Sequence, residues 1–300
     1  MATILITGGS GLIGTHLTST LRTAGHTVRH LSRTPGGRSD VPVFTWDVEQ
    51  GVLDPAALAG VDHIVHLAGA PIDHGRWTPR RVQELIDSRA ESARLLLRVA
   101  REQGTRPTSF VSAAGINYYG AVTSDHIFTE DDPPGNDTIG RISRAWEDAV
   151  DEWCDHCRVV KLRTPPVQAA DGGALPRLAG LARWGLAAPL GTGRQIWPWV
   201  HIDDLVAAYV RAITDPVLQG AYNVCAPEQP DNRTSMRTLA RVLHRPFLLP
   251  PVPGILLRLL LGGVADALLH GSRISGSRLK ATGFTFQYPE LEPALRDLLQ

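Results

Sequence analysis

The sequence predicts an α/β protein with a doubly wound parallel sheet and a smaller, mainly helical C-terminal lobe. Short β-branched runs alternate with segments whose apolar residues recur every three or four positions, which is typical of a parallel sheet covered on both faces. A glycine-rich turn directly follows the first of these runs. The alternation breaks at "RTPPVQAADGGALPRLAG", where proline and glycine cluster, and this break indicates a second unit.

The predicted elements follow one another in a regular order. Strands are expected at 3–7, 26–32, 41–46, 62–68, 108–114 and 158–163, and helices at 12–24, 79–103 and 143–156. After the break come a helix at 201–213, a strand at 220–226, and then helices and turns from about 227 to 300. We therefore expect the chain to leave the sheet, return to it once and leave it again.

The 300-residue chain has a balanced charge, which excludes some classes of partner. It has 30 basic and 30 acidic residues, so it lacks the basic surface of a nucleic-acid or anionic-membrane binder. Three cysteines, an N-terminus that enters a strand pattern by Thr3, and no charged-then-apolar leader predict a cytoplasmic protein. The apolar run at 254–269 contains Arg258 and Asp266, so it predicts a buried helix rather than a membrane span.

The glycine-rich turn "TILITGGSGLIGTHL" places Gly8, Gly11 and Gly14 at the spacing G-x-x-G-x-x-G. Gly8 permits the tight turn, Gly11 lets the backbone approach a pyrophosphate, and Gly14 lets helix and strand pack closely. The helix then begins with Leu12 and Ile13, where free N–H groups and the positive dipole end favour phosphate. The turn therefore predicts a dinucleotide socket, and a glycine turn without a ligand is the alternative.

The tip of the second predicted strand indicates which dinucleotide binds. An acidic residue there would hold a ribose 2′-hydroxyl, but "HLSRTPGGR" has Ser32 and Arg33, and no acid precedes Asp40. Arg33, with Arg38, can pair a 2′-phosphate bidentately. We expect NADP(H) rather than NAD(H), with a solvated surface arginine as the alternative for Arg33. Asp47, after the third strand, is placed to accept from the adenine amino group.

The backbone after the fourth strand completes the expected socket. Leu67, Ala68 and Gly69 in "HLAGAP" form a small-residue passage where the chain can lie against the cofactor. The two expected units are residues 1–165 with a return segment at about 200–226, a Rossmann-type NADP-binding domain, and residues 166–199 and 227–300, a substrate-binding lobe.

Several motifs together resemble a known superfamily. They are "ITGGSGLIG", "HLAGAPI", "DSR", "YYG", "GGALPRL", "PWVHIDDLV" and the tail from "RPFLLPPVPGILLRLLLGGVADALL" to "GFTFQYP". They resemble the extended short-chain dehydrogenase/reductases and, within them, the atypical SDR39U1-like epimerase family proteins with their own C-terminal domain. The resemblance covers nearly the whole chain. It implies a Rossmann domain, an NADP(H) site and a cleft under the C-terminal lobe, while the substrates of that branch are poorly defined.

The superfamily's chemistry uses a Tyr-x-x-x-Lys pair and an upstream hydroxyl. The tyrosine exchanges a proton with a carbonyl or alcohol while hydride passes to or from the nicotinamide, and the lysine lowers the phenol pKa. Anchored on "AWE", these positions fall on Ile139 and Ser143, and neither residue can act in this way. Ala114 takes the place of the hydroxyl, with Ser112 two residues earlier, and Gly75 stands where the branch has lysine.

The tyrosines after the fifth strand are the expected replacements. Tyr118 or Tyr119 should face the nicotinamide, but a phenol with a pKa near 10 needs a cation beside it, for which Arg76 or His74 is available. The other tyrosine is expected to pack with its hydroxyl bonded to the backbone. His74 is also suited to acid or base work, Arg76 to binding a carboxylate or phosphate, and Trp77 to walling the pocket. A plain surface loop is the alternative for these three.

Three other groups favour structural roles. His201 and the two aspartates of "WVHIDDL" are expected to open a helix, with a carboxylate capping its first turn, although His201 could border the cleft. Cys154 and Cys157 have no second cysteine pair to complete a zinc site, so we expect them to pack in the core along one helical face and expect no metal. The tryptophans of 171–200 suit either a pocket wall or the lobe core.

Three functions follow, in order of preference. The first is an NADP(H)-dependent oxidoreductase or epimerase-type enzyme for a small carbonyl or hydroxyl substrate, with the acid displaced to Tyr118 or Tyr119. The second is a redox-neutral isomerase, cyclase or lyase that keeps the dinucleotide in the pocket wall. The third is a non-enzymatic NADP(H)-sensing protein. No nucleic-acid or membrane partner is expected, and a homodimer through helices 79–103 and 139–156, common in the resembling superfamily, is favoured.

Overall fold

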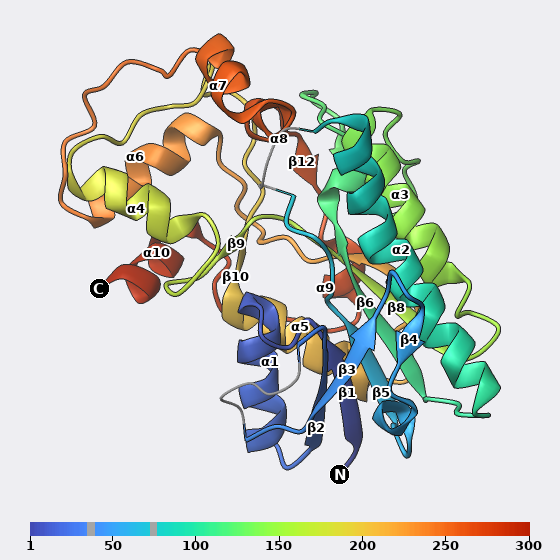
Figure 1. The fold of residues 1–300 in the computed structure, drawn as a ribbon. Coiled ribbons are helices and arrows are strands. Elements are labelled where there is room, and N and C mark those ends of the chain that lie inside the picture. Colours follow the sequence, from blue (N-terminus) through green and yellow to red (C-terminus); the bar gives the residue numbers. More distant parts are fainter. Residues whose placement is uncertain (35–39, 73–76) are drawn as a thin grey trace.

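A computed structural model describes residues 1–34, 40–72 and 77–300 (Figure 1). Its main sheet has eight strands in the order β11-β8-β6-β5-β1-β2-β3-β4. The strands are β1 (Thr3–Thr7), β2 (Thr27–Ser32), β3 (Val43–Asp47), β4 (Val52–Leu53), β5 (His63–His66), β6 (Ser109–Gly115), β8 (Arg158–Thr164) and β11 (Gly220–Asn223). All pair in parallel except β4, which runs antiparallel to β3. The strand order reverses between β1 and β5, where open α/β sheets bind their ligands.

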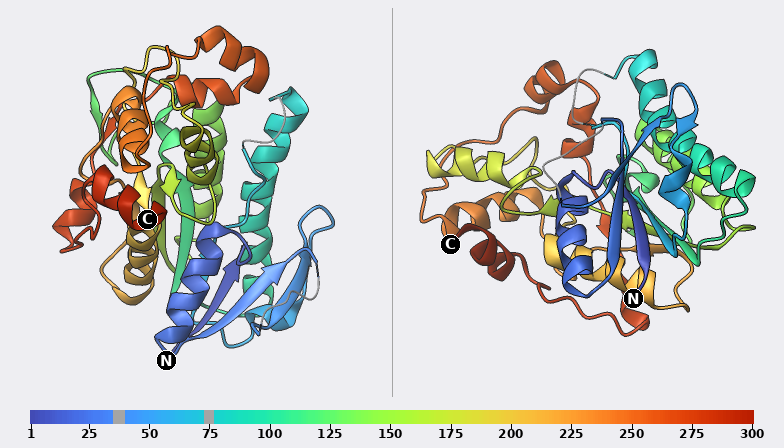
Figure 2. Two further views of the ribbon diagram at one scale, coloured as in Figure 1. Left: turned by 90° about the vertical axis from the view of Figure 1, so that its left-hand side faces the viewer. Right: turned by 60° about the horizontal axis from the view of Figure 1, so that its bottom comes forward.

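Helices cover both faces of this sheet. Helices α1 (Leu12–Thr23) and α5 (Ile202–Thr214) lie on one face, and α2 (Pro79–Glu102) and α3 (Thr138–Asp151) lie on the other (Figure 2). Successive strand side chains point to opposite faces, so Ile4 and Ile6 join the core under α1 and α5, whereas Leu5 joins the core under α2 and α3. The predicted fold class, a doubly wound parallel sheet, is confirmed.

The C-terminal lobe consists here of α4 (Leu175–Arg183), α6 (Asn232–Val242), α7 (Gly254–Leu261), α8 (Val264–Leu269) and α10 (Leu291–Leu299). Leu175, Met236, Leu239 and Leu295 belong to a buried cluster that α4, α6 and α10 share. Two small parallel pairs lie beside the main sheet: β9 (Val167–Gln168) with β10 (Val200–His201), and β7 (Ile127–Phe128) with β12 (Arg273–Ile274). The remaining elements are the 3₁₀ helices η1 (Pro55–Leu58) and η2 (Ile116–Tyr119), and α9 (Ser277–Ala281).

Helix α3 differs from the predicted helix at 143–156. It begins at Thr138 because the side chain of Asp137 caps it, accepting the N–H of Gly140 at 2.8 Å. It ends at Asp151, so the two cysteines of the C-x-x-C lie in the following turns. Cys154 is exposed and Cys157 is half-buried against the core, and the prediction that both pack along one helical face is therefore wrong.

Helix α7 is not the buried helix that its composition suggested. Ile255 is 79% exposed, and Leu259 and Leu260 are each 68% exposed. The run breaks at Gly262, whose φ of +60° ends the helix after two turns, and the lobe core is formed by α4, α6 and α10 instead. Within the described residues, no helix combines the length and apolar character needed to cross a bilayer.

Candidate functional site

The glycine turn after β1 has the conformation that its spacing predicted. Gly8 adopts a φ of +68°, and the N–H of Gly11 donates to its carbonyl oxygen at 3.0 Å. A Cβ atom on Gly14 would lie 2.5 Å from the oxygen of Gly8 and 2.6 Å from the Cα of Gly9, so only glycine allows helix α1 to approach the turn this closely. The cap residue of α1 is Gly11, which has no side chain to bond the first N–H groups of the helix.

Position 9 must also be glycine, although Gly9 is not one of the three glycines of the G-x-x-G-x-x-G spacing. A Cβ atom there would come within 2.4 to 2.6 Å of the His30 ring, which lies buried at the centre of β2. His30 Nε2 is 2.8 Å from the hydroxyl oxygen of Thr18 on α1. Burial lowers the pKa of His30, so a neutral ring packs under the turn.

The backbone after β5 lies directly against this turn. The N–H groups of Leu67 and Ala68 both donate to Thr7 Oγ1 at 3.1 Å, and a Cβ atom on Gly8 would be 3.1 Å from the carbonyl carbon of Leu67. A Cβ atom on Gly69 would lie 3.0 Å from the Arg89 guanidinium, so a side chain there would require Arg89 to shift. The structure thus brings together the turn at Gly8 and the passage at 67–69, as a shared dinucleotide socket requires.

A buried polar chain fixes that passage to helix α2. The oxygen Thr7 Oγ1 lies 2.9 Å from His66 Nδ1, and His66 Nε2 lies 3.1 Å from Ser92 Oγ. Thr7 Oγ1 already accepts two N–H groups, so its own proton goes to His66 Nδ1, and the ring carries its proton on Nε2. Complete burial lowers the pKa of His66 to about 4. Sequence reasoning missed this chain because its members come from three separate segments.

The residues expected to bind the 2′-phosphate and the adenine of the dinucleotide lie at the ends of β2 and β3. Ser32 ends β2, and its hydroxyl oxygen accepts the N–H of Thr34 at 3.3 Å, while Arg33 is exposed just beyond it. Asp47 ends the neighbouring strand β3, and its Oδ1 accepts the N–H of Gln50 at 3.0 Å, which leaves the other carboxylate oxygen for a ligand. Their roles toward the 2′-phosphate and the adenine stay predictions, and Arg38 lies outside the described residues.

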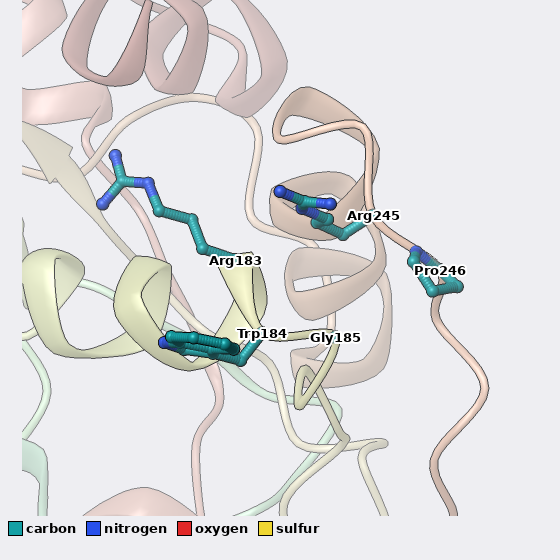
Figure 3. A pocket seen from close by; sticks show the side chains of 5 residues that line it. All are labelled: Arg183, Trp184, Gly185, Arg245 and Pro246. Atoms are coloured by element: carbon teal, nitrogen blue, oxygen red, sulfur yellow. The ribbon is translucent and has the colours of Figure 1, made fainter.

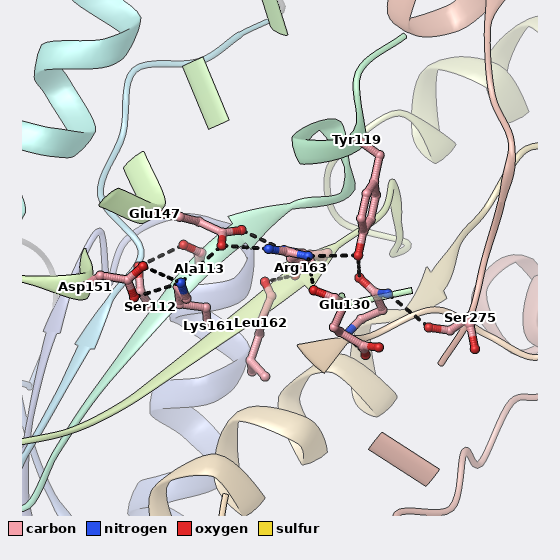
Figure 4. A network of polar contacts seen from close by, with 12 residues as sticks. Ser112, Ala113, Tyr119, Glu130, Glu147, Asp151, Lys161, Leu162, Arg163 and Ser275 are labelled. Carbon is pink, nitrogen blue, oxygen red and sulfur yellow. Dashed lines mark hydrogen bonds and ion pairs between the residues drawn. The ribbon is translucent and has the colours of Figure 1, made fainter. Parts of the chain in front are cut away.

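Tyr119 lies in a buried polar network (Figure 4). Its hydroxyl donates to Asn223 Oδ1 at 2.8 Å and accepts from Arg163 Nη1 at 2.9 Å. Burial raises the pKa of Tyr119 to about 12, against the opposing influence of Arg163. These contacts favour the structural role that we expected for one of the two tyrosines, with its hydroxyl bonded to side chains rather than to the backbone.

The cation beside the tyrosines is Arg163 on β8, a residue that the sequence had not indicated. Its guanidinium carbon lies 3.6 Å from the centroid of the Tyr118 ring, and Tyr118 is half-buried. Glu147 on α3 holds the same guanidinium by two bonds, Nε to Oε1 at 2.7 Å and Nη2 to Oε2 at 2.9 Å. Although burial alone would lower the pKa of Arg163, the Glu147 carboxylate raises it. His74 and Arg76 lie outside the described residues.

The positions of the superfamily's proton-transfer residues are buried, and none holds a tyrosine or lysine. Ile139 and Ser143 are buried on successive turns of α3, and Ala114 is buried near the end of β6. The hydroxyl of Ser112 donates to the carbonyl oxygen of Ala113 at 2.8 Å, so it is not free to meet a substrate. Lys161 does not replace the missing lysine, because its ammonium group pairs with Asp151 at 2.7 Å, beyond Ser143 along α3.

A hollow of about 770 Å³ lies between the start of α3 and the loop and helix α8 of the C-terminal lobe, and we call it the α3/α8 hollow. Its lining residues are Trp77, Pro79, Val82, Ala121, Asp137, Thr138, Ile139, Arg141, Arg258, Gly263, Asp266, Ala267 and His270. Because Ile139 is among them, the hollow adjoins the position of the superfamily's tyrosine. Its volume falls in the range of small-molecule sites.

Trp77 forms one wall of this hollow, as expected. Its Nε1–H donates to the carbonyl oxygen of Ile72 at 3.1 Å. A Cβ atom on Gly263 would lie 3.0 to 3.3 Å from Trp77, so the absence of a side chain at Gly263 lets the start of α8 pack against the indole. The hollow thus has walls from both parts of the chain.

Most charged groups of the hollow are already paired. Asp137 accepts the N–H of Gly140 at 2.8 Å and that of Ala121 at 2.6 Å, and Arg258 Nε lies 3.1 Å from Asp266 Oδ1. His270 Nδ1 is 3.3 Å from the hydroxyl oxygen of Thr123. Arg141 is exposed, with a 3.5 Å contact to the Thr138 hydroxyl. Sequence reasoning missed Arg141 and His270, because no local motif links residues so far apart.

His201 and the two aspartates of "WVHIDDL" do not line the hollow. His201 is buried, caps α5 by accepting the N–H of Asp203 at 3.1 Å, and stacks on Tyr288 at 3.8 Å. The expectation that a carboxylate caps this turn is wrong: Asp204 instead accepts the N–H groups of Gln287 and Tyr288. The His201 ring is buried against Tyr288 while its Nδ1 caps the helix.

The three tryptophans of 171–200 also lie away from the hollow. Trp197 and Trp199 belong to the lobe core, where Trp199 Nε1 donates to the carbonyl oxygen of Glu228 at 2.7 Å. Trp184 lies on the outside of the lobe beside a surface hollow with Arg183 and Arg245 (Figure 3).

Comparisons with known proteins agree with this geometry. Residues 4–225 match the NAD dependent epimerase/dehydratase family, and residues 252–298 match a domain of unknown function, DUF1731. The epimerase family protein Mb2239 of Mycobacterium bovis is 35% identical over 98% of this chain and 96% of its own. The human epimerase family protein SDR39U1 is 33% identical over 99% of each chain. The crystal structure of human SDR39U1 (isoform 2) with NADPH is 31% identical, with a TM-score of 0.88 over 99% of this chain and 98% of that one.

Proposed function

Because the chain belongs to the NAD dependent epimerase/dehydratase family, we propose that it is an NADP(H)-dependent enzyme of the short-chain dehydrogenase/reductase type, acting on a small carbonyl or hydroxyl compound. The observation that carries this proposal is the cradle at Gly14, where any side chain would strike the backbone of Gly8 and Gly9. A turn with that constraint keeps a helix start within reach of a pyrophosphate.

Several residues fit the phosphorylated dinucleotide. The first N–H groups of α1, at Leu12 and Ile13, follow an uncapped Gly11, whereas Thr78 caps α2 and Asp137 caps α3. An anion is therefore the natural partner for the start of α1. Arg33, exposed beyond β2, would pair the 2′-phosphate, in line with the NADPH of the human relative's crystal structure.

Tyr118 is the proton-transfer residue that we propose. When bound, the nicotinamide supplies or accepts the hydride. Tyr118 lies between the carboxyl end of β6 and the buried network, with Arg163 over its ring, while the hydroxyl of Tyr119 is held by two partners. The α3/α8 hollow, with the C-terminal lobe on one side, is the proposed substrate site.

A stopped-flow screen tests this function. The NADPH-loaded protein is mixed with a panel of aldehydes and ketones, and the NADP⁺-loaded protein with alcohols, while the absorbance of the reduced nicotinamide is followed. At least one class of compound should change the absorbance in a single turnover. If the protein binds NADPH yet no compound of either class alters its absorbance, the redox proposal is wrong.

A redox-neutral isomerase, cyclase or lyase is the second candidate. It is favoured by one observation: the three positions of the superfamily's proton-transfer machinery hold Ile139, Ser143 and Ala114, and all three are buried. Such an enzyme would keep turning over with a redox-inactive dinucleotide analogue in the socket. Strict dependence of turnover on the oxidation state of the nicotinamide would exclude it.

A further inference from the structure

The α3/α8 hollow has two arginines in its lining, and Arg141 is the one that forms no ion pair with the residues that the structure describes. Arg258 and Asp266 neutralise each other, and Asp137 is satisfied by two backbone N–H groups. The Arg141 guanidinium forms no ion pair with a carboxylate of the described residues, and its hydrogen bond there is the long one of 3.5 Å to the Thr138 hydroxyl. An anionic group that entered the hollow would therefore find Arg141 available.

The position of Arg141 strengthens this attraction. It lies in the first turns of α3, where the positive end of the helix dipole adds to the charge of the guanidinium. Across the hollow, Thr123 Oγ1 accepts the N–H of Gly271 at 3.3 Å and lies 3.3 Å from His270 Nδ1. Thr123 Oγ1 can therefore donate its own proton to Nδ1, and in that tautomer the Nε2–H of His270 is a hydrogen-bond donor.

Apolar side chains also line the hollow, alongside Asp137, Thr138 and the Arg258–Asp266 pair. Trp77, Val82, Ile139 and Ala267 line the hollow beside Arg141 and His270. A pocket with apolar walls and a few polar groups selects a ligand with a matching apolar body and polar ends. A single guanidinium matches one carboxylate through two parallel bonds, whereas a doubly charged phosphate would call for further cations.

Building on the proposed function, we propose that the substrate is a carboxylic acid with an apolar body, bound in the α3/α8 hollow. The Arg141 guanidinium holds its carboxylate, Trp77 and Ile139 contact its body, and the Nε2–H of His270 donates to a second oxygen of the substrate. The proposal narrows the substrate from any small carbonyl or hydroxyl compound to oxo acids and hydroxy acids.

Calorimetric titration with defined probes tests this inference. Benzoylformate, its neutral methyl ester and phenyl phosphate are titrated into the wild-type protein, both with NADPH bound and without dinucleotide. The same titrations are made with Arg141→Gln and with Arg144→Gln as the matched control. Arg144 is on the same helix, is exposed, and lies 3.6 Å from Asp148 rather than in the hollow.

We expect benzoylformate to bind more tightly than its ester and than phenyl phosphate. Arg141→Gln should weaken benzoylformate by about tenfold or more and leave the ester unchanged, while Arg144→Gln should change neither. Circular dichroism of both variants should match the wild type, since both side chains are exposed.

Equal binding of acid and ester, no binding of the acid, preference for phenyl phosphate, or an unaffected Arg141→Gln protein would each overturn the inference. A separate titration of NADPH, followed by its fluorescence, keeps the two proposals apart. If NADPH fails to bind, the proposed function is wrong, and the comparison of acid and ester without dinucleotide still decides whether Arg141 recognises a carboxylate.

Discussion

Tyr118 and Tyr119 are neighbours in the chain, but their hydroxyl groups have different surroundings. The Tyr119 hydroxyl is buried between Asn223 and Arg163, and its pKa is raised by that burial. A phenol with both hydrogen-bonding roles filled can neither reach a substrate nor lose its proton near neutral pH. Tyr118 is half-buried, so it is the member of the pair that can meet a ligand.

Phenylalanine substitutions should separate these two roles. Tyr119→Phe should lower the free energy of unfolding by about 1 to 3 kcal/mol, because it leaves a buried arginine N–H and amide oxygen without a partner. Tyr118→Phe should change stability by less than about 0.5 kcal/mol but reduce turnover by about 100-fold or more. Urea unfolding and single-turnover kinetics measure the two effects. A Tyr119→Phe protein of full stability but no turnover would reverse the assignment.

The ring of His66 makes stability depend on pH. Its folded pKa of about 4 is below the ordinary value of 6.5, so between these values the unfolded chain binds a proton that the native ring does not. This contribution is constant above pH 6.5 and makes stability fall as the pH falls toward 4. From pH 7 to pH 5 the loss should be about 2 kcal/mol.

Urea unfolding of the wild type and of His66→Gln at both pH values isolates that contribution. The variant should be less stable at pH 7, because its amide cannot reproduce the bonds to Thr7 and Ser92, but it should lose less stability on acidification. If both proteins lost the same free energy of unfolding between pH 7 and pH 5, His66 would be protonated in the native state at pH 5.

Some site residues could be predicted from the sequence because their signal is local. Gly8, Gly11 and Gly14 act within one turn, so their spacing alone indicates the bend and the close approach of the helix. Arg141 and His270 line the same hollow only because the C-terminal lobe folds beside α3, and no pattern along the chain indicates this. The same holds for Arg163, whose partners lie on two other elements.

At the scale of elements, the pair of Arg163 and Glu147 joins β8 to α3. Both side chains are about 95% buried, and Lys161 Nζ also lies 3.3 Å from Glu147 Oε2. Loss of Glu147 would leave the buried Arg163 charge without this carboxylate, whereas loss of Arg163 would leave Glu147 with the Lys161 ammonium beside it. Because the pair ties α3 to β8, it also helps to hold α3 in place along the sheet. Ile139 and Arg141, which line the hollow, lie on that helix.

Glu147→Gln should therefore lower the free energy of unfolding by about 3 to 5 kcal/mol, because it removes the carboxylate that holds the buried Arg163 guanidinium. The exposed pair of Arg94 and Glu152, at 2.7 Å, is the matched control, and Arg94→Gln should cost less than about 1 kcal/mol. Both are measured by urea unfolding. Equal small losses would mean that the buried pair contributes no more than a surface pair.

Dinucleotide binding should depend on the close packing of α1 on the glycine turn. Gly14→Ala should abolish detectable NADPH binding, because the added methyl must push the backbone of Gly8 or α1 away. Gly180→Ala is the control: it lies in helix α4 with open space around its Cβ position, and it should gain about 0.5 to 1 kcal/mol in stability with unchanged binding. Fluorescence titration of NADPH decides the question.

Element boundaries depended on contacts that the sequence does not display. The start of α3 is set by Asp137, which bonds both Gly140 within the helix and Ala121 from a distant loop. The apolar residues of α7 suggested burial, yet burial depends on whether another element covers them. Strands β1, β2 and β6 were predicted within a residue of their bounds, because β-branched runs buried on two faces leave a clear signal.

At the scale of the whole molecule, the chain passes repeatedly between sheet and lobe. It leaves the sheet after β8, forms α4, returns through α5 and β11, and leaves again for α6. Leu298 of α10 packs against both the sheet core under α5 and the lobe core. If either the sheet domain or the lobe unfolded, it would therefore expose buried surface of the other.

Calorimetry should accordingly show one unfolding transition, with equal calorimetric and van't Hoff enthalpies. Saturating NADPH should raise the Tm of that whole transition, since a ligand stabilises the entire cooperative unit that holds its site. Two resolved peaks, of which NADPH moves only one, would show that the parts unfold independently.

The bare aliphatic surface of α7 has a practical consequence. Ile255, Leu259 and Leu260 project into water from a two-turn helix that borders the α3/α8 hollow through Arg258. Sulfate and other strongly hydrated salts penalise such surface, whereas mild detergents cover it. Salting-out during purification would therefore favour association of copies of the molecule through α7, next to the α3/α8 hollow. A trace of detergent in a binding measurement would compete with a hydrophobic ligand for the same surface.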